Sequence, residues 1–206
     1  MGVYKWYSYF SQQEVFRQTL LRYAPSNVNI FAIDLNGIIH TNAQKVFGYG
    51  KTKKTDAELG LVLVNGILVQ SQERYDELEQ ELFKSIFDEI VELTKTVAPS
   101  ETLIIAVDGT APVGKINQQR NRRYKSASDP GKSKVFDSNC ITPGTEFMFR
   151  LDTYIQETLD ELIEYDEMTE TERQDPENEL IASYAKGLPT RIIYSSHMCP
   201  GEGEHR

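Results

Sequence analysis

The sequence predicts an α/β fold with a mainly parallel sheet, because three short apolar runs alternate with long helical patterns. The runs are typical of buried strands and cover residues 28–33, 102–107 and 191–195. Each run ends at a polar or acidic residue. Ligands of open α/β sheets collect at the carboxyl ends of the strands, so we expect the functional site at that edge.

Two segments have the apolar periodicity of long amphipathic helices, with one stripe facing the sheet. The first covers residues 72–97. The second covers residues 145–168, follows Pro143-Gly144 and has Thr145 as its candidate N-cap. The residues predicted to face inward are Tyr75, Leu78, Leu82, Ile86, Ile90, Leu93 and Val97 in the first helix, and Phe149, Leu151, Ile155, Leu159 and Leu162 in the second.

Residues 59–70 change to a strand pattern, with aliphatic runs on either side of Asn65-Gly66. Asn-Gly between such runs is a strong signal for a two-residue turn, because both residues tolerate positive φ. We therefore predict a β-hairpin here, inserted into the surrounding α/β pattern.

The composition fits one soluble globular domain over residues 1–206, with 39% apolar and 26% charged residues. No apolar run approaches the roughly 20 residues that a membrane-spanning helix needs. The N-terminus lacks the apolar core of a secretory signal. Cys140 and Cys199 give no disulfide framework and fit a reducing compartment. We expect an intracellular protein with no membrane association, in the cytoplasm rather than the nucleus.

The charge is strongly segregated along the chain. The net charge is −9, yet residues 115–134 carry +6, so the remainder carries −15. Attraction to a polyanion is governed by the local field, and a positive segment can therefore bind nucleic acid even in an acidic protein. The acidic excess between Asp152 and Glu179 is typical of a solvated helix face.

Acidic residues follow all three predicted strands. Asp34 and Asp108 come directly after the first two, and Glu202 and Glu204 lie between glycines after the third. A single Asp in such a place often caps a helix or forms a turn. Two glutamates between glycines are poorly explained in that way, because glycine allows close backbone approach and lets both carboxylates converge on one cation. The pattern favours a divalent metal site.

Four phosphate-binding donors lie on one face of a predicted helix, spaced at i, i+4, i+7 and i+8. With no carboxylate partner they would repel one another, which favours anion binding; they are Lys115, Gln119, Arg122 and Arg123. Residues 109–115 also have the spacing of a P-loop. Ile116 replaces the metal-binding hydroxyl and Pro112 removes a backbone donor, so nucleotide triphosphate binding is disfavoured.

Taken together, these motifs resemble the XRN family of 5′→3′ exoribonucleases. They follow one another in the order typical of the family and span nearly the whole chain. The resembling segments are Met1-Gly-Val-Tyr-Lys-Trp-Tyr7, Asp34-Leu-Asn-Gly-Ile-Ile-His40, Val107-Asp-Gly-Thr-Ala-Pro112, Lys115-Ile-Asn-Gln-Gln-Arg-Asn-Arg-Arg123, Phe136-Asp-Ser-Asn-Cys-Ile-Thr-Pro-Gly-Thr-Glu-Phe147 and Pro200-Gly-Glu-Gly-Glu-His205.

The resemblance implies a three-layer PIN/FEN-like nuclease fold with helices on both sheet faces. It also implies hydrolysis of single-stranded RNA with a 5′-monophosphate to 5′-mononucleotides. Two Mg²⁺ ions, for which Mn²⁺ can substitute, would then bind the carboxylates that match the family's catalytic acids. His40 matches a residue that stacks on the terminal base. The matching acids are Asp34, Asp108, Glu202 and Glu204, and the residues matching the 5′-phosphate pocket are Lys115, Gln119, Arg122 and Arg123.

The sequence stops at Arg206, before the further metal-binding aspartates that the resemblance implies. We therefore expect a fragment of a longer nuclease, with a fold and an active site that are incomplete at the C-terminus. Two alternatives stay open: a module that binds 5′-phosphorylated RNA without cutting it, and a FEN-like structure-specific DNA nuclease. The sequence does not identify protein partners.

Overall fold

The computed structural model describes residues 9, 12–14, 27–127, 133 and 135–203. Its centre is a parallel sheet in the order β1-β4-β5, formed by Ile30–Asp34, Thr102–Ala106 and Arg191–Ser195. Asp34 pairs with Ala106, and Ala106 pairs with Ser195, so the three strands end level with one another. The predicted parallel sheet is confirmed, and the loops that follow its strands emerge at one edge.

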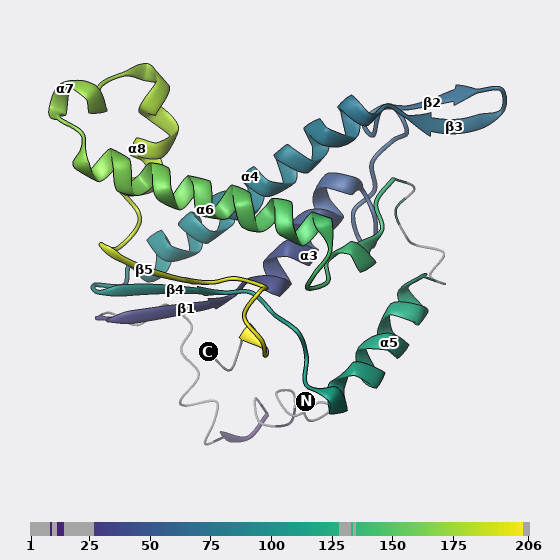
Figure 1. Ribbon diagram of the computed structural model, residues 1–206, viewed down its shortest axis with the longest axis horizontal. Coiled ribbons are helices and arrows are strands. Elements are labelled where there is room, and N and C mark those ends of the chain that lie inside the picture. The colour runs from purple at the N-terminus through teal and green to yellow at the C-terminus, as the bar shows by residue number, and fades with distance from the viewer. Residues whose placement is uncertain (1–8, 10–11, 15–26, 128–132, 134, 204–206) are drawn as a thin grey trace.

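Three long helices lie on one side of this sheet (Figure 1): α3 (Leu35–Phe47), α4 (Gln72–Val97) and α6 (Glu146–Glu167). The basic helix α5 (Val113–Ala127) lies beyond the carboxyl ends of the strands. The sequence predicted helices on both faces of the sheet. Within the described residues, α3, α4 and α6 cover one face (Figure 1). No described helix has the length and apolarity needed to cross a membrane.

Helix α4 shows how the sequence sets the packing. Ser71 caps it by accepting a hydrogen bond from the Arg74 amide, and Ala98 ends it in a left-handed conformation. The centre of its inward stripe, from Leu78 to Ile90, is fully buried, and the end positions Tyr75 and Val97 are partly buried. The predicted inward positions Leu93 and, in α6, Phe149 are 37% and 61% exposed. Each lies at the edge of its helix stripe, where tertiary contacts rather than periodicity decide burial. Phe83, Phe87 and Val91 on α4 and Phe147 and Met148 on α6 are buried as well.

Strands β2 (Leu61–Val64) and β3 (Ile67–Gln70) form an antiparallel hairpin within the segment for which the sequence predicts one. Its turn residues Asn65 and Gly66 have φ values of 49° and 80°, as a two-residue hairpin turn requires. The hairpin projects from the body of the molecule (Figure 1). The remaining short elements are η1 (Ser138–Cys140), α7 (Glu170–Arg173), η2 (Pro176–Asn178) and α8 (Glu179–Ala185).

A salt bridge between α6 and α4 gives a first stability prediction. Arg150 donates two hydrogen bonds to Glu79, Nε to Oε2 at 2.6 Å and Nη2 to Oε1 at 2.8 Å. Glu79 is only 4% exposed. Arg150→Met is therefore expected to lower the free energy of unfolding by about 1–3 kcal/mol, because it leaves a buried carboxylate without its partner. Urea denaturation measures the change.

The double variant Glu79→Leu/Arg150→Met tests the cause of that loss. Removing the carboxylate together with the guanidinium eliminates the uncompensated charge, so the double variant is expected to be more stable than Arg150→Met alone. A double variant that is less stable than the single one would contradict this explanation.

Candidate functional site

A cleft of about 420 Å³ opens between α3, α5 and the segment around η1, at the carboxyl edge of the sheet. Five of the residues selected from the sequence line it, one from the loop after β4, one from α3 and three from α5. They are Asp108, His40, Gln119, Arg122 and Arg123. The cleft therefore joins a carboxylate to a basic helix face, as the chain order predicts.

Asp34 is the last residue of β1 and the N-cap of α3, where its Oδ1 accepts a hydrogen bond from the Asn36 amide at 3.1 Å. The capping interpretation of this residue is therefore correct for one oxygen, and the side chain remains exposed at the sheet edge. Asn36 itself lines the cleft, and its buried Nδ2 has no hydrogen-bond partner among the described residues. A buried donor without a partner beside a cleft is well suited to an oxygen ligand.

The loops that follow β4 and β5 are tied together by backbone hydrogen bonds. Asp108 Oδ1 accepts from the Gly203 amide at 2.8 Å, and the Gly109 amide donates to the Gly201 carbonyl at 2.8 Å. A Cβ at Gly203 would lie 3.2 Å from the Ala106 carbonyl oxygen. Glycine at this position therefore allows the loop after β5, the third acidic loop, which carries Glu202, to reach Asp108. This close approach explains the glycine that follows Glu202.

Glu202 is 6% exposed and forms an ion pair with Lys115. The premise that all four donors of the basic helix lack a carboxylate partner is therefore wrong for Lys115. A buried carboxylate needs a compensating charge, and the ammonium group in the first turn of α5 provides it. Lys115 does not line the cleft, whose basic side consists of Gln119, Arg122 and Arg123.

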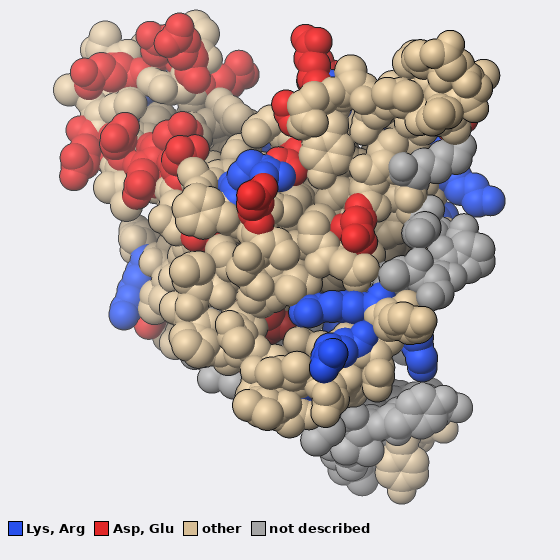
Figure 2. Space-filling model, turned by 45° about the vertical axis from the view of Figure 1, so that its right-hand side comes forward, with Lys and Arg blue, Asp and Glu red and all other residues tan. Residues whose placement is uncertain are grey.

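Arg122 and Arg123 have no ion-pair partner within the part of the chain that is described. Across the cleft, burial and then the charge of Arg122 lower the pKa of His40 below its usual value. Because the neutral form is favoured, His40 presents a flat uncharged ring beside the basic face at pH 7. Figure 2 shows basic side chains gathered on one part of the surface and acidic side chains on another.

The predicted metal ligands are only partly assembled in the described structure. Asp34, Asp108 and Glu202 lie at the same end of the sheet, while Glu204 lies outside the described residues. Among the described residues, no group of three or more His, Cys, Asp or Glu side chains is placed to hold a metal ion. The donor set is nevertheless made of carboxylate oxygens, which are the ligands that Mg²⁺ prefers.

Sequence reasoning missed a polar cluster around Asp152 that lies beside the start of the loop after β5. Asp152 of α6 accepts hydrogen bonds from Tyr194 Oη at 2.5 Å and Gln156 Nε2 at 2.8 Å. His197 begins the loop that carries Glu202; it is 3% exposed, and its Nδ1 lies 4.0 Å from Asp152 Oδ1. Burial and the bond to Asp152 raise the pKa of Tyr194. Asp152 and Gln156 are spaced at i, i+4 on α6, but Tyr194 and His197 come from β5 and the loop after it, so no spacing rule identifies the whole cluster.

The two cysteines differ in exposure. Cys199 is exposed, whereas burial, helped by Asp137, raises the pKa of the Cys140 thiol to about 12. We expect iodoacetamide at pH 7.5 to modify Cys199 and leave Cys140 unmodified, because only the thiolate reacts. Peptide mass spectrometry measures this, and Cys199→Ser should abolish labelling of the folded protein. Equal labelling of both thiols would contradict the prediction.

Comparisons with known proteins identify the family of this chain. Residues 1–206 match the family described as XRN 5'-3' exonuclease N-terminus. The chain is 32% identical to 5'-3' exoribonuclease 1 of Schizosaccharomyces pombe over 162 residues, which are 69% of this chain and 11% of that protein. It is 35% identical to 5'-3' exoribonuclease 1 of Saccharomyces cerevisiae over 142 residues, 62% of this chain and 8% of that protein.

The Homo sapiens 5'-3' exoribonuclease 1 gives 32% identity over 164 residues, 69% of this chain and 8% of that protein. The chain thus corresponds to a small part of the length of these relatives. The family match covers every residue of the sequence, including the three acidic loops and the basic helix. The chain therefore belongs to the XRN 5'-3' exonuclease family and represents its N-terminal region.

Proposed function

We propose that this chain forms the N-terminal part of the active site of a Mg²⁺-dependent 5′→3′ exoribonuclease. Its substrate would be single-stranded RNA with a 5′-monophosphate, and its products 5′-mononucleotides. The observation that carries the proposal is the cleft itself, in which the Asp108 carboxylate and the Arg122 and Arg123 guanidinium groups line one space of about 420 Å³. Relatives named 5'-3' exoribonucleases support the reaction class.

The basic side of the cleft fits the terminal phosphate. Guanidinium groups bind phosphate oxygens through paired, charge-assisted hydrogen bonds, and Gln119 adds a neutral donor on the same helix face. Arg122 and Arg123 form no ion pair with another described residue, so no ion pair within the described part of the chain has to break when phosphate enters. A 5′-hydroxyl end brings no charge to this pocket and would bind more weakly.

His40 lies across the cleft from the guanidinium groups and would stack on the terminal base. Its lowered pKa keeps the ring neutral, so it adds no further charge to a pocket that is already basic. Stacking on a flat ring is tolerant of base identity and contributes about 1–3 kcal/mol per base. This arrangement suits an enzyme that removes every nucleotide in turn.

The acids at the sheet edge would hold the metal. Asp34, Asp108 and Glu202 would contribute carboxylate oxygens, together with Glu204. When bound, Mg²⁺ supplies an activated water and stabilises the leaving oxygen. Gly203 orients Asp108 through its amide hydrogen bond, and Lys115 balances the charge of the buried Glu202 carboxylate.

A second candidate, a module that binds 5′-phosphorylated RNA without cutting it, is favoured by two observations. Lys115 neutralises Glu202, and the described acids do not form a metal-binding group. The phosphate-binding face is independent of these acids, so binding without hydrolysis is compatible with the same cleft. The two candidates differ in whether Mg²⁺ changes the RNA or leaves it intact.

The test is mononucleotide release from matched RNAs that carry either a 5′-monophosphate or a 5′-hydroxyl, in Mg²⁺ or in EDTA. Circular dichroism first establishes that the protein is folded. Mg²⁺-dependent release that favours the monophosphate supports the enzyme, and intact RNA that stays bound in EDTA supports the binding module. Asp108→Asn is the control, because the amide can still accept from Gly203 while the charge is lost; it should abolish release and preserve binding.

A further inference from the structure

The cleft follows helix α3 along its length. Asn36, His40 and Gln44 line it at positions i, i+4 and i+8, and Tyr49 lines it just after the helix has ended. With a rise of about 1.5 Å per residue, the distance along the helix from Asn36 to Gln44 is about 12 Å. Because α3 begins at the carboxyl edge of the sheet, Tyr49 lies at the other end of the cleft from the acids.

The turn after α3 holds Tyr49 in place. Gly48 ends the helix in a left-handed conformation, with φ of 62°. The Tyr49 amide then donates to the Gln44 carbonyl at 3.2 Å, and the Tyr49 carbonyl accepts from the Thr52 amide at 3.2 Å. The Tyr49 ring stacks on the buried Phe136, with centroids 6.1 Å apart. Backbone and ring are therefore both fixed, and the phenol is presented to the cleft already ordered.

The hydroxyl group of Tyr49 has no use in the fold that the described residues show. Its oxygen is buried and makes no hydrogen bond with any of them. Burial, helped by the nearby Cys140, raises the pKa of Tyr49 to about 12, so the group stays protonated at pH 7 and can donate a hydrogen bond. A buried donor without a partner in the lining of a cleft indicates a ligand that carries an acceptor oxygen.

The position of this donor favours the terminal phosphate over other parts of the RNA. In the proposed reaction the bond that breaks lies beside the acids at the sheet edge, so the 5′ end of the departing nucleotide points away from them. Tyr49 lies in that direction, past His40 on the same side of the cleft. Among the described residues that line the cleft, Asp108 is the only carboxylate, so a negative group can approach Tyr49 without meeting another acid.

We propose that the Tyr49 hydroxyl donates a hydrogen bond to the terminal 5′-phosphate and is a specificity-determining residue of this pocket. It adds a neutral donor on the α3 side to Gln119, Arg122 and Arg123 on the α5 side. The inference rests on the proposed function. Tyr49 lies between the family-like segments 34–40 and 107–112, so none of the sequence motifs gives it a role.

The experiment measures binding of two matched RNAs, with a 5′-monophosphate or a 5′-hydroxyl, to the whole chain in EDTA by fluorescence anisotropy. Tyr49→Phe is expected to weaken binding of the monophosphate RNA about tenfold and to leave the hydroxyl RNA unchanged, because only a hydrogen bond to a charged group is lost. Tyr75→Phe is the matched control. Tyr75 stacks on Phe47 in the same aromatic cluster but is not among the residues that line the cleft, so neither affinity should change.

Urea denaturation separates this role from a structural one. Tyr49→Phe keeps the ring and its stacking on Phe136, and the hydroxyl it removes has no hydrogen-bond partner in the described structure. The variant should therefore be at least as stable as the unsubstituted chain. A clear loss of stability would show that the hydroxyl serves the fold, and it would overturn the proposal.

The outcomes also distinguish this inference from the proposed function. A preference for the 5′-phosphate that Tyr49→Phe leaves unchanged, or an equal loss of affinity for both RNAs, overturns the role of Tyr49 and leaves the basic pocket intact. Absence of any preference in the unsubstituted chain overturns the proposed function, and the inference with it.

Discussion

Replacement of Phe47 by Ala is expected to lower the free energy of unfolding by about 3–5 kcal/mol. The side chain is fully buried at the end of α3. Its ring stacks on Phe136 with centroids 4.2 Å apart and an interplanar angle of 8°, and on Tyr75 at 5.8 Å. Removing the ring eliminates its transfer free energy and leaves a cavity that rigid aromatic neighbours cannot fill.

Urea denaturation of Phe47→Ala and Phe149→Ala measures this effect against a matched control. Phe149 is 61% exposed on α6, so its replacement should change stability by no more than about 0.5 kcal/mol. Phe136 also stacks on Tyr49, which lines the cleft. Weaker RNA binding by folded Phe47→Ala is therefore expected as well. Equal losses of stability in the two variants would contradict the packing argument.

The local elements could be predicted because their signals are local. The apolar runs of the parallel sheet and the Asn65-Gly66 turn depend on residues that are adjacent in sequence. The burial of individual helix positions could not be predicted in the same way. Leu93 and Phe149 fit the apolar periodicity but are exposed, because the neighbouring elements do not cover those edges of the helices.

For the site, the sequence predicted where the acidic loops lie but not which side chains pair with one another. That the loops carrying Asp34, Asp108 and Glu202 emerge at one edge of the sheet follows from parallel strands that end level with one another. The choice of partners does not follow from chain order. Lys115 pairs with Glu202 instead of facing the cleft, and this depends on where α5 begins relative to a loop far away in sequence. The burial of the Asn36 Nδ2 donor and the hydrogen bonds around Asp152 also depend on the three-dimensional packing and not on spacing in the sequence.

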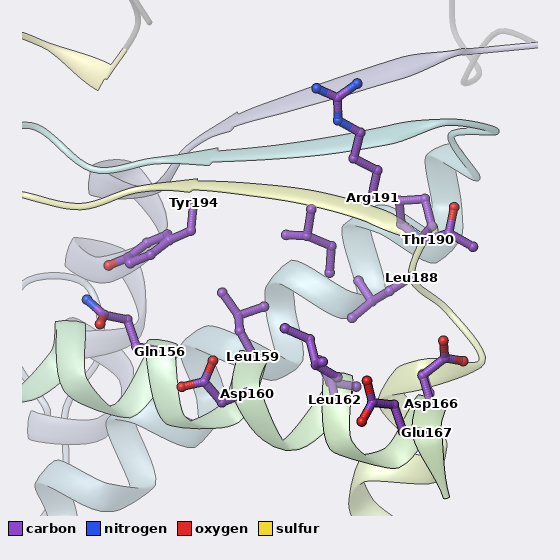
Figure 3. Close-up of a pocket in the computed structure, with 14 residues that line it drawn as sticks. Gln156, Leu159, Asp160, Leu162, Asp166, Glu167, Leu188, Thr190, Arg191 and Tyr194 are labelled. Atoms are coloured by element: carbon purple, nitrogen blue, oxygen red, sulfur yellow. The ribbon is translucent and has the colours of Figure 1, made fainter.

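The acidic segment shows the same limit. Composition predicts a solvated helix face, and most acidic residues of α6 are indeed exposed. A groove of about 670 Å³ between α6 and β5 lies beside that face (Figure 3), and its lining includes Leu188 and Ile192, which are distant from α6 in sequence. A periodicity reading of α6 alone assigns Leu159 and Leu162 to the core, and the structure leaves both partly exposed.

Arg122→Ala is expected to reduce the preference for 5′-phosphate over 5′-hydroxyl RNA by about 2 kcal/mol, which is roughly 30-fold in affinity ratio. Arg122 lines the cleft, and its charge contributes to the lowered pKa of His40. The guanidinium therefore acts on both sides of the space in which the phosphate and the base would lie. Binding of the two matched RNAs in EDTA measures the ratio without requiring hydrolysis.

Arg120→Ala is the matched control for this prediction. Arg120 lies on the same helix and is exposed, but it does not line the cleft. Both variants remove one positive charge and therefore weaken general attraction to RNA to a similar extent. Only Arg122→Ala should change the ratio between the two RNA ends. An equal loss on both ends would show that Arg122 contributes only to the general field, and the 5′-phosphate would then have to be bound elsewhere.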